Sequence, residues 1–175
     1  MIVYTVHPEF LYKKMREEGY LEGDEAYAMF PEAYKWMVSQ MKKRMSLSFE
    51  GYPIWVWKRR PNRNERALAT KGQRWVILTL DIPKEQILFS SFSEWHSILN
   101  NSPITFDEAE WDNFKEMDFP GEAVKATWER LFDWEWLASR PIDWAGDINK
   151  EWIQGVTPRI TMEHVKKVSR FIGKG

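Results

Sequence analysis

Histidine is the side chain best suited to move protons near neutral pH, and the chain has three of them, His7, His96 and His164. Each stands at the edge of a predicted strand or helix, so each could serve as an acid, a base or a ligand, or could cap an element at the surface. The segment SEWH brings Glu94 near His96 in sequence, but residues two apart do not face each other on a helix. The chain has no cysteine and no spacing typical of a metal motif, so we expect no thiolate chemistry, no disulfide and no metal site.

A second candidate for chemistry is the strongly basic segment from Lys58 to Arg74, which also contains asparagines. Cations and amides of this kind contact phosphate, and flanking tryptophans such as Trp75 could stack on bases, so RNA or a protein is a candidate partner. The alternative is a solvated hairpin loop, and the formal net charge of -1 argues against a dedicated nucleic-acid-binding domain. The cations of this segment are Lys58, Arg59, Arg60, Arg63, Arg66, Lys71 and Arg74.

These side chains need a scaffold, and the N-terminal part of the chain predicts a strand followed by two helices. Ile2–Val6 alternates and is rich in β-formers, which is typical of a strand. Pro8 suits the first position of a helix that has an apolar face and ends at Gly19. A second helix is predicted to begin near Pro31, where apolar residues at three- and four-residue spacing form one face rich in methionine.

The rest of the chain alternates between predicted strands and predicted helices. Tyr52–Arg60 is predicted as a strand, and residues 74–83 are apolar enough to form a strand inside a sheet. A short partner strand at 85–92 leads into a helix for which Ser93 is the predicted N-cap. Two helices are predicted within 107–137, and a strand, a turn, one helical turn and a closing strand complete the chain.

Length and composition are those of an ordinary globular protein, with 43% hydrophobic and 29% charged residues in 175. No internal repeat or linker interrupts the pattern, so we expect a single α+β domain over residues 1–175. The eleven tryptophans are expected to build the core, with a few left for a ligand pocket or partner surface. There is no signal peptide pattern and no apolar run of membrane-spanning length, so we expect a soluble cytoplasmic protein without membrane contact.

The whole chain resembles a bacterial family that is known only as a domain of unknown function. The resemblance lies in the YT opening and in the segments YPIWVW, LDIPKEQILFSSFSEWHSILN and WIQGVTPRITMEHVKKV. This likeness is fairly specific, but it implies no activity.

The order of segments is also similar to that of the ADP-ribosyltransferase fold. That resemblance implies an α+β fold with an ADP-ribosyltransferase-like split antiparallel sheet and inserted helices. In one branch of this superfamily, a first strand carries a histidine that contacts the nicotinamide ribose, a second strand carries a tyrosine that stacks on nicotinamide, and a late strand carries the catalytic glutamate. Here Thr5 stands in the place of the histidine, Trp55 in that of the tyrosine and Gln154 in that of the glutamate, so all three positions depart from the active pattern.

These departures favour ligand binding over the usual catalysis. Transfer of ADP-ribose passes through a cationic transition state that a carboxylate stabilises, and a glutamine supplies no charge. Threonine keeps a hydroxyl and tryptophan keeps a stacking surface. We therefore expect a cleft that binds a nucleotide or NAD-like ligand, with NAD or ADP-ribose as candidates and Arg59 contacting pyrophosphate. The residues expected to bind the ligand are Thr5, His7, Trp55, Trp57, Arg59 and Gln154.

Other interpretations stay open at this point. The three matched positions could be ordinary strand residues, with Trp55 in the core. The chain could be an atypical ADP-ribosyltransferase or NAD glycohydrolase of the kind found in toxin or phage–host conflict, which would need another carboxylate; Glu151 and Glu163 are the nearest in sequence to Gln154. It could also be a non-enzymatic RNA- or protein-binding module, so the sequence does not decide whether the protein is an enzyme.

Overall fold

The computed structural model describes residues 1–46 and 50–175, apart from the side chain of Tyr27. These residues form two compact units: the first contains residues 1–88 and 154–175, and the second contains residues 89–153. The prediction of a single domain over residues 1–175 concerns whether the two units fold together, and it stays a prediction.

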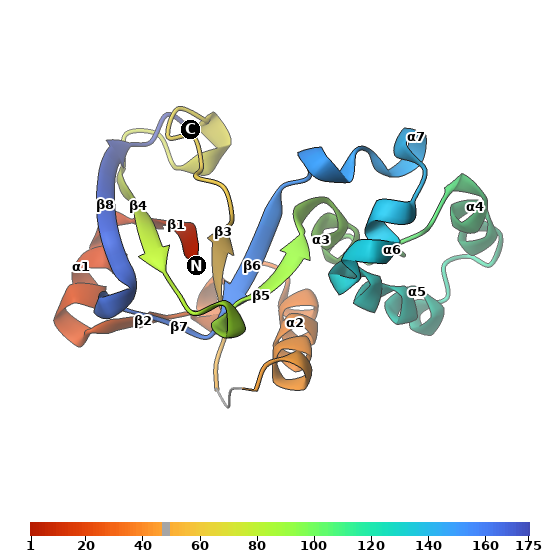
Figure 1. The fold of residues 1–175 in the computed structure, drawn as a ribbon, viewed down its shortest axis with the longest axis horizontal. Helices are drawn as coiled ribbons and strands as arrows, with labels where there is room; N and C mark the ends of the chain where they lie inside the picture. The colour runs from red at the N-terminus through yellow and green to blue at the C-terminus, as the bar shows by residue number, and fades with distance from the viewer. Residues whose placement is uncertain (47–49) are drawn as a thin grey trace. The chain divides into compact units, whose positions relative to one another are not determined.

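The sheet is antiparallel and has six strands in the order β5-β6-β3-β1-β4-β8 (Figure 1). Helices and this sheet together make the fold α+β, as predicted. Residues 74–83 do contain an interior strand, because β4 has β1 on one side and β8 on the other. The strands are β1 (Ile2–Pro8), β3 (Ile54–Trp57), β4 (Arg74–Asp81), β5 (Leu88–Ser91), β6 (Ile153–Thr157) and β8 (Val165–Ile172).

The pairings of β1 on its two sides differ in length. With β4, the register runs along the whole strand, from Ile2 opposite Asp81 to Pro8 opposite Trp75. With β3, the register joins Tyr4 to Trp57. Ladder pairing between β1 and β3 therefore does not continue beyond this point, and the residues of β1 after Tyr4 have a sheet partner on the β4 side.

Two helices of the first unit follow the local sequence signals. Helix α1 (Glu9–Glu18) begins after Pro8 and ends at Gly19, which has a φ of 85° and donates its N–H to the carbonyl of Met15 at 2.8 Å. Glycine adopts this left-handed conformation without steric cost, so it ends the helix as predicted. Helix α2 (Pro31–Arg44) has proline in its first turn and buries a face that includes Met37 and Met41.

The short strands β2 (Tyr20–Glu22) and β7 (Arg159–Thr161) form a separate two-stranded sheet in the first unit. The core of this unit is built from strand residues that are fully buried. Burying one such side chain contributes roughly 1.5–3 kcal/mol. These core residues include Val3, Val56, Val76, Leu78, Leu80, Val156 and Ile160.

The second unit is helical. It contains α3 (Phe92–Leu99), α4 (Glu108–Glu116), α5 (Gly121–Thr127), α6 (Trp134–Ser139) and α7 (Ile142–Ala145). The prediction of two helices within 107–137 was wrong, because the second predicted helix is divided. Helix α5 ends at Thr127, a 3-10 helix follows at Trp128–Phe132, and α6 begins after its N-cap Asp133.

The N-cap of α3 is Ser91, whose hydroxyl accepts a hydrogen bond from the N–H of Glu94 at 3.2 Å, so the prediction of Ser93 was two residues late. Ser93 instead donates to Glu151. Short 3-10 helices complete the described chain: Glu25–Tyr27, Arg66–Leu68, Lys84–Gln86, Trp128–Phe132, Ile148–Lys150 and Met162–His164. Among the described residues, no helix has both the length and the hydrophobicity that a membrane span needs.

Candidate functional site

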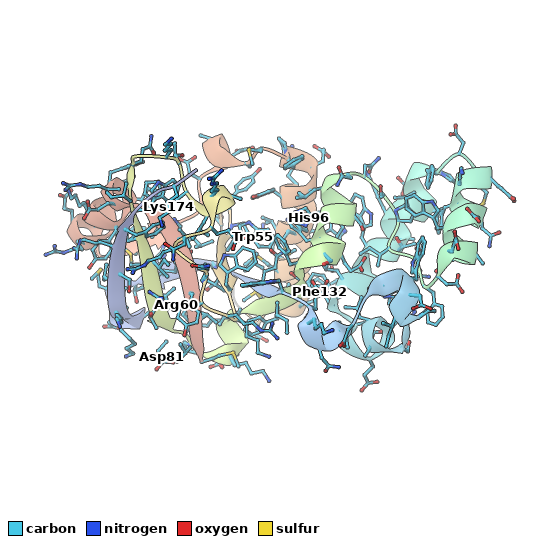
Figure 2. The ribbon with its side chains drawn as sticks, turned by 90° about the horizontal axis from the view of Figure 1, so that it is seen from above. Trp55, Arg60, Asp81, His96, Phe132 and Lys174 are labelled. Carbon is cyan, nitrogen blue, oxygen red and sulfur yellow. The ribbon has the colours of Figure 1, made fainter. Side chains whose placement is uncertain are left out.

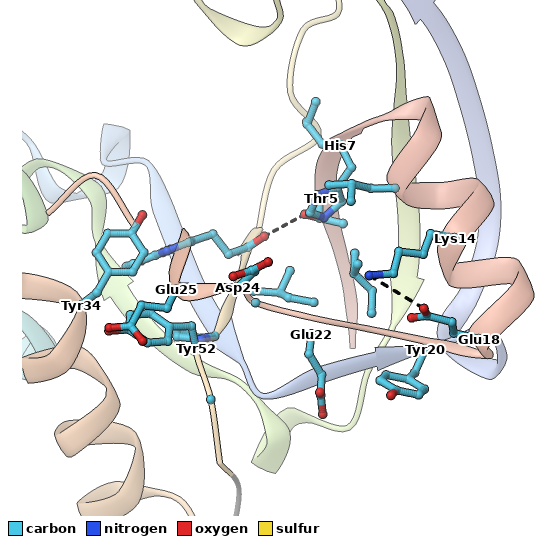
Figure 3. A pocket seen from close by; sticks show the side chains of 18 of the residues that line it. Thr5, His7, Lys14, Glu18, Tyr20, Glu22, Asp24, Glu25, Tyr34 and Tyr52 are labelled. Atoms are coloured by element: carbon cyan, nitrogen blue, oxygen red, sulfur yellow. Dashed lines mark hydrogen bonds and ion pairs between the residues drawn. The ribbon is translucent and has the colours of Figure 1, made fainter. Parts of the chain in front are cut away.

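A pocket of about 870 Å³ lies in the first unit, beside the part of β1 that does not pair with β3 (Figure 3). Its walls come from the end of β1, from α1, from β2 and the turn after it, from α2 through Tyr34, and from residues 51–57. The volume falls within the range of small-molecule binding pockets. The pocket is therefore the candidate ligand site of this unit.

A chain of hydrogen bonds joins β1 and β3 at the pocket wall. The hydroxyl of Thr5 donates to the backbone carbonyl of Trp55 at 2.8 Å, because that carbonyl has no hydrogen to give. The hydroxyl has only one hydrogen, so its oxygen must accept the second bond, from Nε2 of His7 at 2.9 Å. The neutral His7 ring is thus protonated at Nε2, and its Nδ1 keeps a lone pair without a hydrogen bond among the described residues.

Burial lowers the pKa of His7 from 6.5 to about 4. Desolvation has this effect because it penalises the charged imidazolium. At neutral pH the ring, which lines the pocket, is therefore uncharged and has a hydrogen-bond acceptor at Nδ1.

Aromatic rings form a second wall. The ring of Tyr34 from α2 meets Trp55 edge-on at 5.9 Å between centroids and lies 6.3 Å from the ring of Tyr52. Burial raises the pKa of Tyr34, and burial with the hydrogen bond to Glu25 raises the pKa of Tyr52. Both phenols are therefore neutral at physiological pH, and with Trp57 they provide flat surfaces on which a ring could stack.

Carboxylates form the third wall, and two of them pair with cations. Lys14 and Glu18, one turn apart on α1, lie 3.8 Å apart. Glu22 on β2 accepts from Nε of Arg159 on β7 at 2.7 Å. Lys14 lines the pocket, whereas Arg159 does not. Because His7 is neutral, Lys14 is the only cationic side chain among the described lining residues.

The other two carboxylates lie in the turn after β2. Asp24 accepts a hydrogen bond from the N–H of Ala26 at 2.9 Å, and Glu25 accepts from the hydroxyl of Tyr52 at 3.0 Å. Neither bond brings a cation, and in the described part of the chain neither carboxylate has an ion pair. Four carboxylates and one lysine line the pocket, which makes its electrostatic potential negative.

Gly23 allows this turn to approach residues 52–53. Its N–H donates to the carbonyl of Tyr52 at 3.1 Å, and a Cβ at this position would lie 2.5 Å from the carbonyl oxygens of both Tyr52 and Pro53. Only glycine fits that approach without moving backbone, so Gly23 brings the acidic turn and the aromatic wall together.

The structure places four of the six predicted ligand-binding residues in the pocket lining: Thr5, His7, Trp55 and Trp57. The half-buried Trp55 lies at the pocket rather than fully in the core. Gln154 is opposite Trp57 in the register and 3% exposed, but it does not line the pocket, and its Nε2 has no hydrogen-bond partner in the described part of the chain. Arg59 is exposed beyond the end of β3 and is not among the lining residues. Ligand binding by any of the six stays a prediction.

The two carboxylates nearest to Gln154 in sequence also lie outside the pocket lining. Glu151, in the second unit, accepts hydrogen bonds from the hydroxyl of Ser91 at 3.0 Å and from the N–H of Ser93 at 2.9 Å. Glu163 lies in the 3-10 helix Met162–His164. Both therefore occupy positions in which they stabilise local backbone structure or face solvent.

The other two histidines have structural hydrogen bonds. His96 donates from Nδ1 to the carbonyl of Phe92 at 2.8 Å, one turn earlier on α3. His164 accepts at Nδ1 from the N–H of Thr161 at 3.1 Å in a capping box. Among the described residues, no group of three His, Cys, Asp or Glu side chains has an arrangement that could hold a metal ion.

The basic segment lies apart from the pocket lining and is anchored by the C-terminal residues. Gly173 exchanges backbone hydrogen bonds with Gly72 and Gln73 at 3.0 and 2.9 Å, and Lys174 donates to the amide oxygen of Asn64 at 2.7 Å. Arg60 and Lys174 are exposed in the first unit (Figure 2). Within the described chain, five cations of this segment have no ion pair: Lys58, Arg60, Arg63, Arg66 and Lys71.

Sequence reasoning missed most of the acidic and tyrosine-bearing walls. The acids occur in two short runs on either side of Gly19, REE before it and EGDE shortly after it, and this density was the available signal. The sequence did not show that both acidic runs line the same pocket. That arrangement depends on how the chain turns from α1 into β2 and on the contact between Gly23 and Tyr52.

Comparison with known proteins gives a family and no further relative. No curated protein and no solved structure matches the chain. The family described as a domain of unknown function (DUF3841) matches residues 2–122, which include β1, α1, β2, α2 and β3 and therefore every segment that lines the pocket. The chain belongs to this family, in agreement with the resemblance that its YPIWVW and LDIP segments show.

Proposed function

We propose that the chain is a ligand-binding protein and that the pocket of its first unit accepts the ring-bearing end of a nucleotide or NAD-like molecule. The observation that carries the proposal is the hydrogen-bonded chain from His7 through Thr5 to Trp55 at the wall of a pocket of about 870 Å³. It holds two side chains that can hydrogen-bond sugar or base atoms beside an aromatic surface that can stack on a ring.

The order of segments in the sequence, which resembles that of the ADP-ribosyltransferase fold, suggested the same ligand class. Two of the three positions matched to that family, Thr5 and Trp55, line the pocket. In this proposal Trp55 stacks on the ring and Thr5 positions His7, while the third position, Gln154, lies one strand further along the sheet.

Ligand titration of a tryptophan variant tests the proposal. NAD, ADP-ribose and ATP would be titrated by calorimetry into the wild-type protein, Trp55→Ala and the control Trp144→Ala, which removes a tryptophan that is 38% exposed in the second unit. We expect at least a tenfold loss of affinity in Trp55→Ala and none in the control. Equal affinity in a folded Trp55→Ala variant would refute the pocket assignment.

An NAD-consuming enzyme is a second candidate because the pocket is lined by carboxylates, although none of them is Glu151 or Glu163. A carboxylate near the sugar could stabilise a developing positive charge. The test is release of nicotinamide from NAD, measured for the wild-type protein and for variants in which each lining carboxylate is changed singly to its amide. Turnover that is lost in one amide variant and retained in Glu151→Gln and Glu163→Gln would identify the catalytic group.

RNA binding by the basic segment is a third candidate, favoured by five of its cations that form no ion pair with any residue the structure describes. Each phosphate contact releases counterions, so affinity for a short RNA would fall steeply with salt. Neutralising Arg60, Arg63 and Arg66 together would remove this salt dependence. A shallow salt dependence in the wild-type protein would exclude this function.

A further inference from the structure

We infer that the pocket selects a group that donates hydrogen bonds and carries no negative charge, so that it takes a nucleoside and leaves any phosphate outside. This inference rests on the proposed function and narrows its ligand class. It follows from the charged side chains that line the pocket, which are four carboxylates and one lysine, and from the neutral state of His7.

The acceptors come from two walls. On β1, the uncharged His7 has a lone pair at Nδ1, because its Nε2 hydrogen is used by Thr5. Around β2, the carboxylates of Glu18, Glu22, Asp24 and Glu25 present oxygens. Hydroxyl and amino groups of a nucleoside can donate to these atoms, whereas a phosphate at neutral pH offers few hydrogens and further negative charge.

The donors that a phosphate needs are few. Phosphate sites typically use arginine, several lysines or the N–H groups of a glycine-rich turn at a helix N-terminus. Among the described lining residues there is no arginine, and the single Lys14 lies 3.8 Å from Glu18. No glycine-rich turn precedes α1, and its first turn already carries the acidic side chain of Glu9.

The aromatic wall agrees with a ring-bearing group. Trp55 and Trp57 lie on the same face of β3, and Tyr34 and Tyr52 add neutral phenols from other segments. Rings that are uncharged or positively charged stack well on such surfaces, and a positive ring would also be attracted by the nearby carboxylates. The walls therefore favour the base and sugar over the phosphates of the same molecule.

The experiment compares adenosine, AMP and ADP as probes at 0.15 M salt, with Trp55→Ala as the site control. We expect adenosine to bind at least tenfold more tightly than AMP, and AMP more tightly than ADP. The double variant Asp24→Asn, Glu25→Gln should reduce the ratio between adenosine and AMP severalfold. The control Glu85→Gln removes an exposed acid that does not line the pocket and should leave the ratio unchanged.

A second variant, His7→Phe, keeps an aromatic ring at this position and removes the Nδ1 acceptor. We expect it to weaken adenosine binding at least tenfold. An unchanged circular dichroism spectrum would show that the variant is folded. Affinity that rises with each added phosphate, and that still depends on Trp55, would overturn the inference and leave the proposed function intact. The absence of binding by all three probes, and by NAD and ADP-ribose, would overturn both.

Discussion

The stability of the protein should depend on pH through His7. Its pKa is lowered from 6.5 to about 4 in the folded chain because burial disfavours the imidazolium. Between these two values the unfolded chain binds a proton that the folded chain does not, so lowering the pH favours unfolding. The stabilisation is complete above pH 6.5 and is lost as the pH falls toward 4.

The size of the effect follows from linkage. Over the full interval between the two pKa values, the free energy of unfolding falls by about 3 kcal/mol. Between pH 7.5 and pH 5 the loss is about 2 kcal/mol, since most of the unfolded chains are already protonated at the lower pH. This is a large part of the 5–15 kcal/mol that a domain typically has.

The assay is urea denaturation of the wild-type protein and of His7→Gln at a series of pH values from 7.5 to 5. Glutamine can still donate to the Thr5 hydroxyl but does not titrate, so the difference between the two proteins isolates His7 and cancels the other titrations. We expect the wild-type protein to lose about 2 kcal/mol more than the variant. Parallel pH profiles, or a His7 imidazole that titrates near 6.5 by NMR, would refute the reasoning.

Three further substitutions test packing within each unit and at the pocket. Gly23→Ala should destabilise the protein by about 2 kcal/mol or more, because its Cβ would lie 2.5 Å from two carbonyl oxygens, whereas Gly121→Ala meets nothing within 4 Å and should leave the melting temperature nearly unchanged. Glu94→Ala leaves the Arg140 guanidinium, 2.5 Å away and 6% exposed, without its charge partner, which should cost about 3–5 kcal/mol in chemical denaturation. Thr5→Val keeps the shape of the side chain but removes the hydroxyl that donates at 2.8 Å, so we expect a loss of about 1–2 kcal/mol in urea denaturation; an unchanged midpoint would show that this bond does not hold β1 to β3.

Local signals were sufficient for most helices and strands. Gly19 and Pro31 act on the backbone within one turn of their own position, and they marked the end of α1 and the start of α2 correctly. Pro8, predicted at the first position of α1, is its N-cap, so the helix begins one residue later. Where two signals compete within one turn, sequence alone did not choose correctly. Ser91 and Ser93 are equally good N-caps by type, and both hydroxyls donate to the carboxylate of Glu151, nearly sixty residues away in sequence, but only the Ser91 hydroxyl also accepts the N–H of Glu94.

For the candidate site, the sequence by itself determined which strands carry Thr5, His7, Trp55 and Trp57, because alternation along a strand is a local property. Only the tertiary structure decided that the pairing of β1 with β3 does not continue after Tyr4 and that the acidic turn closes on Tyr52 through Gly23. The reason is physical: the charge and proton state of a pocket depend on which groups meet across space, and those groups are separated by tens of residues along the chain.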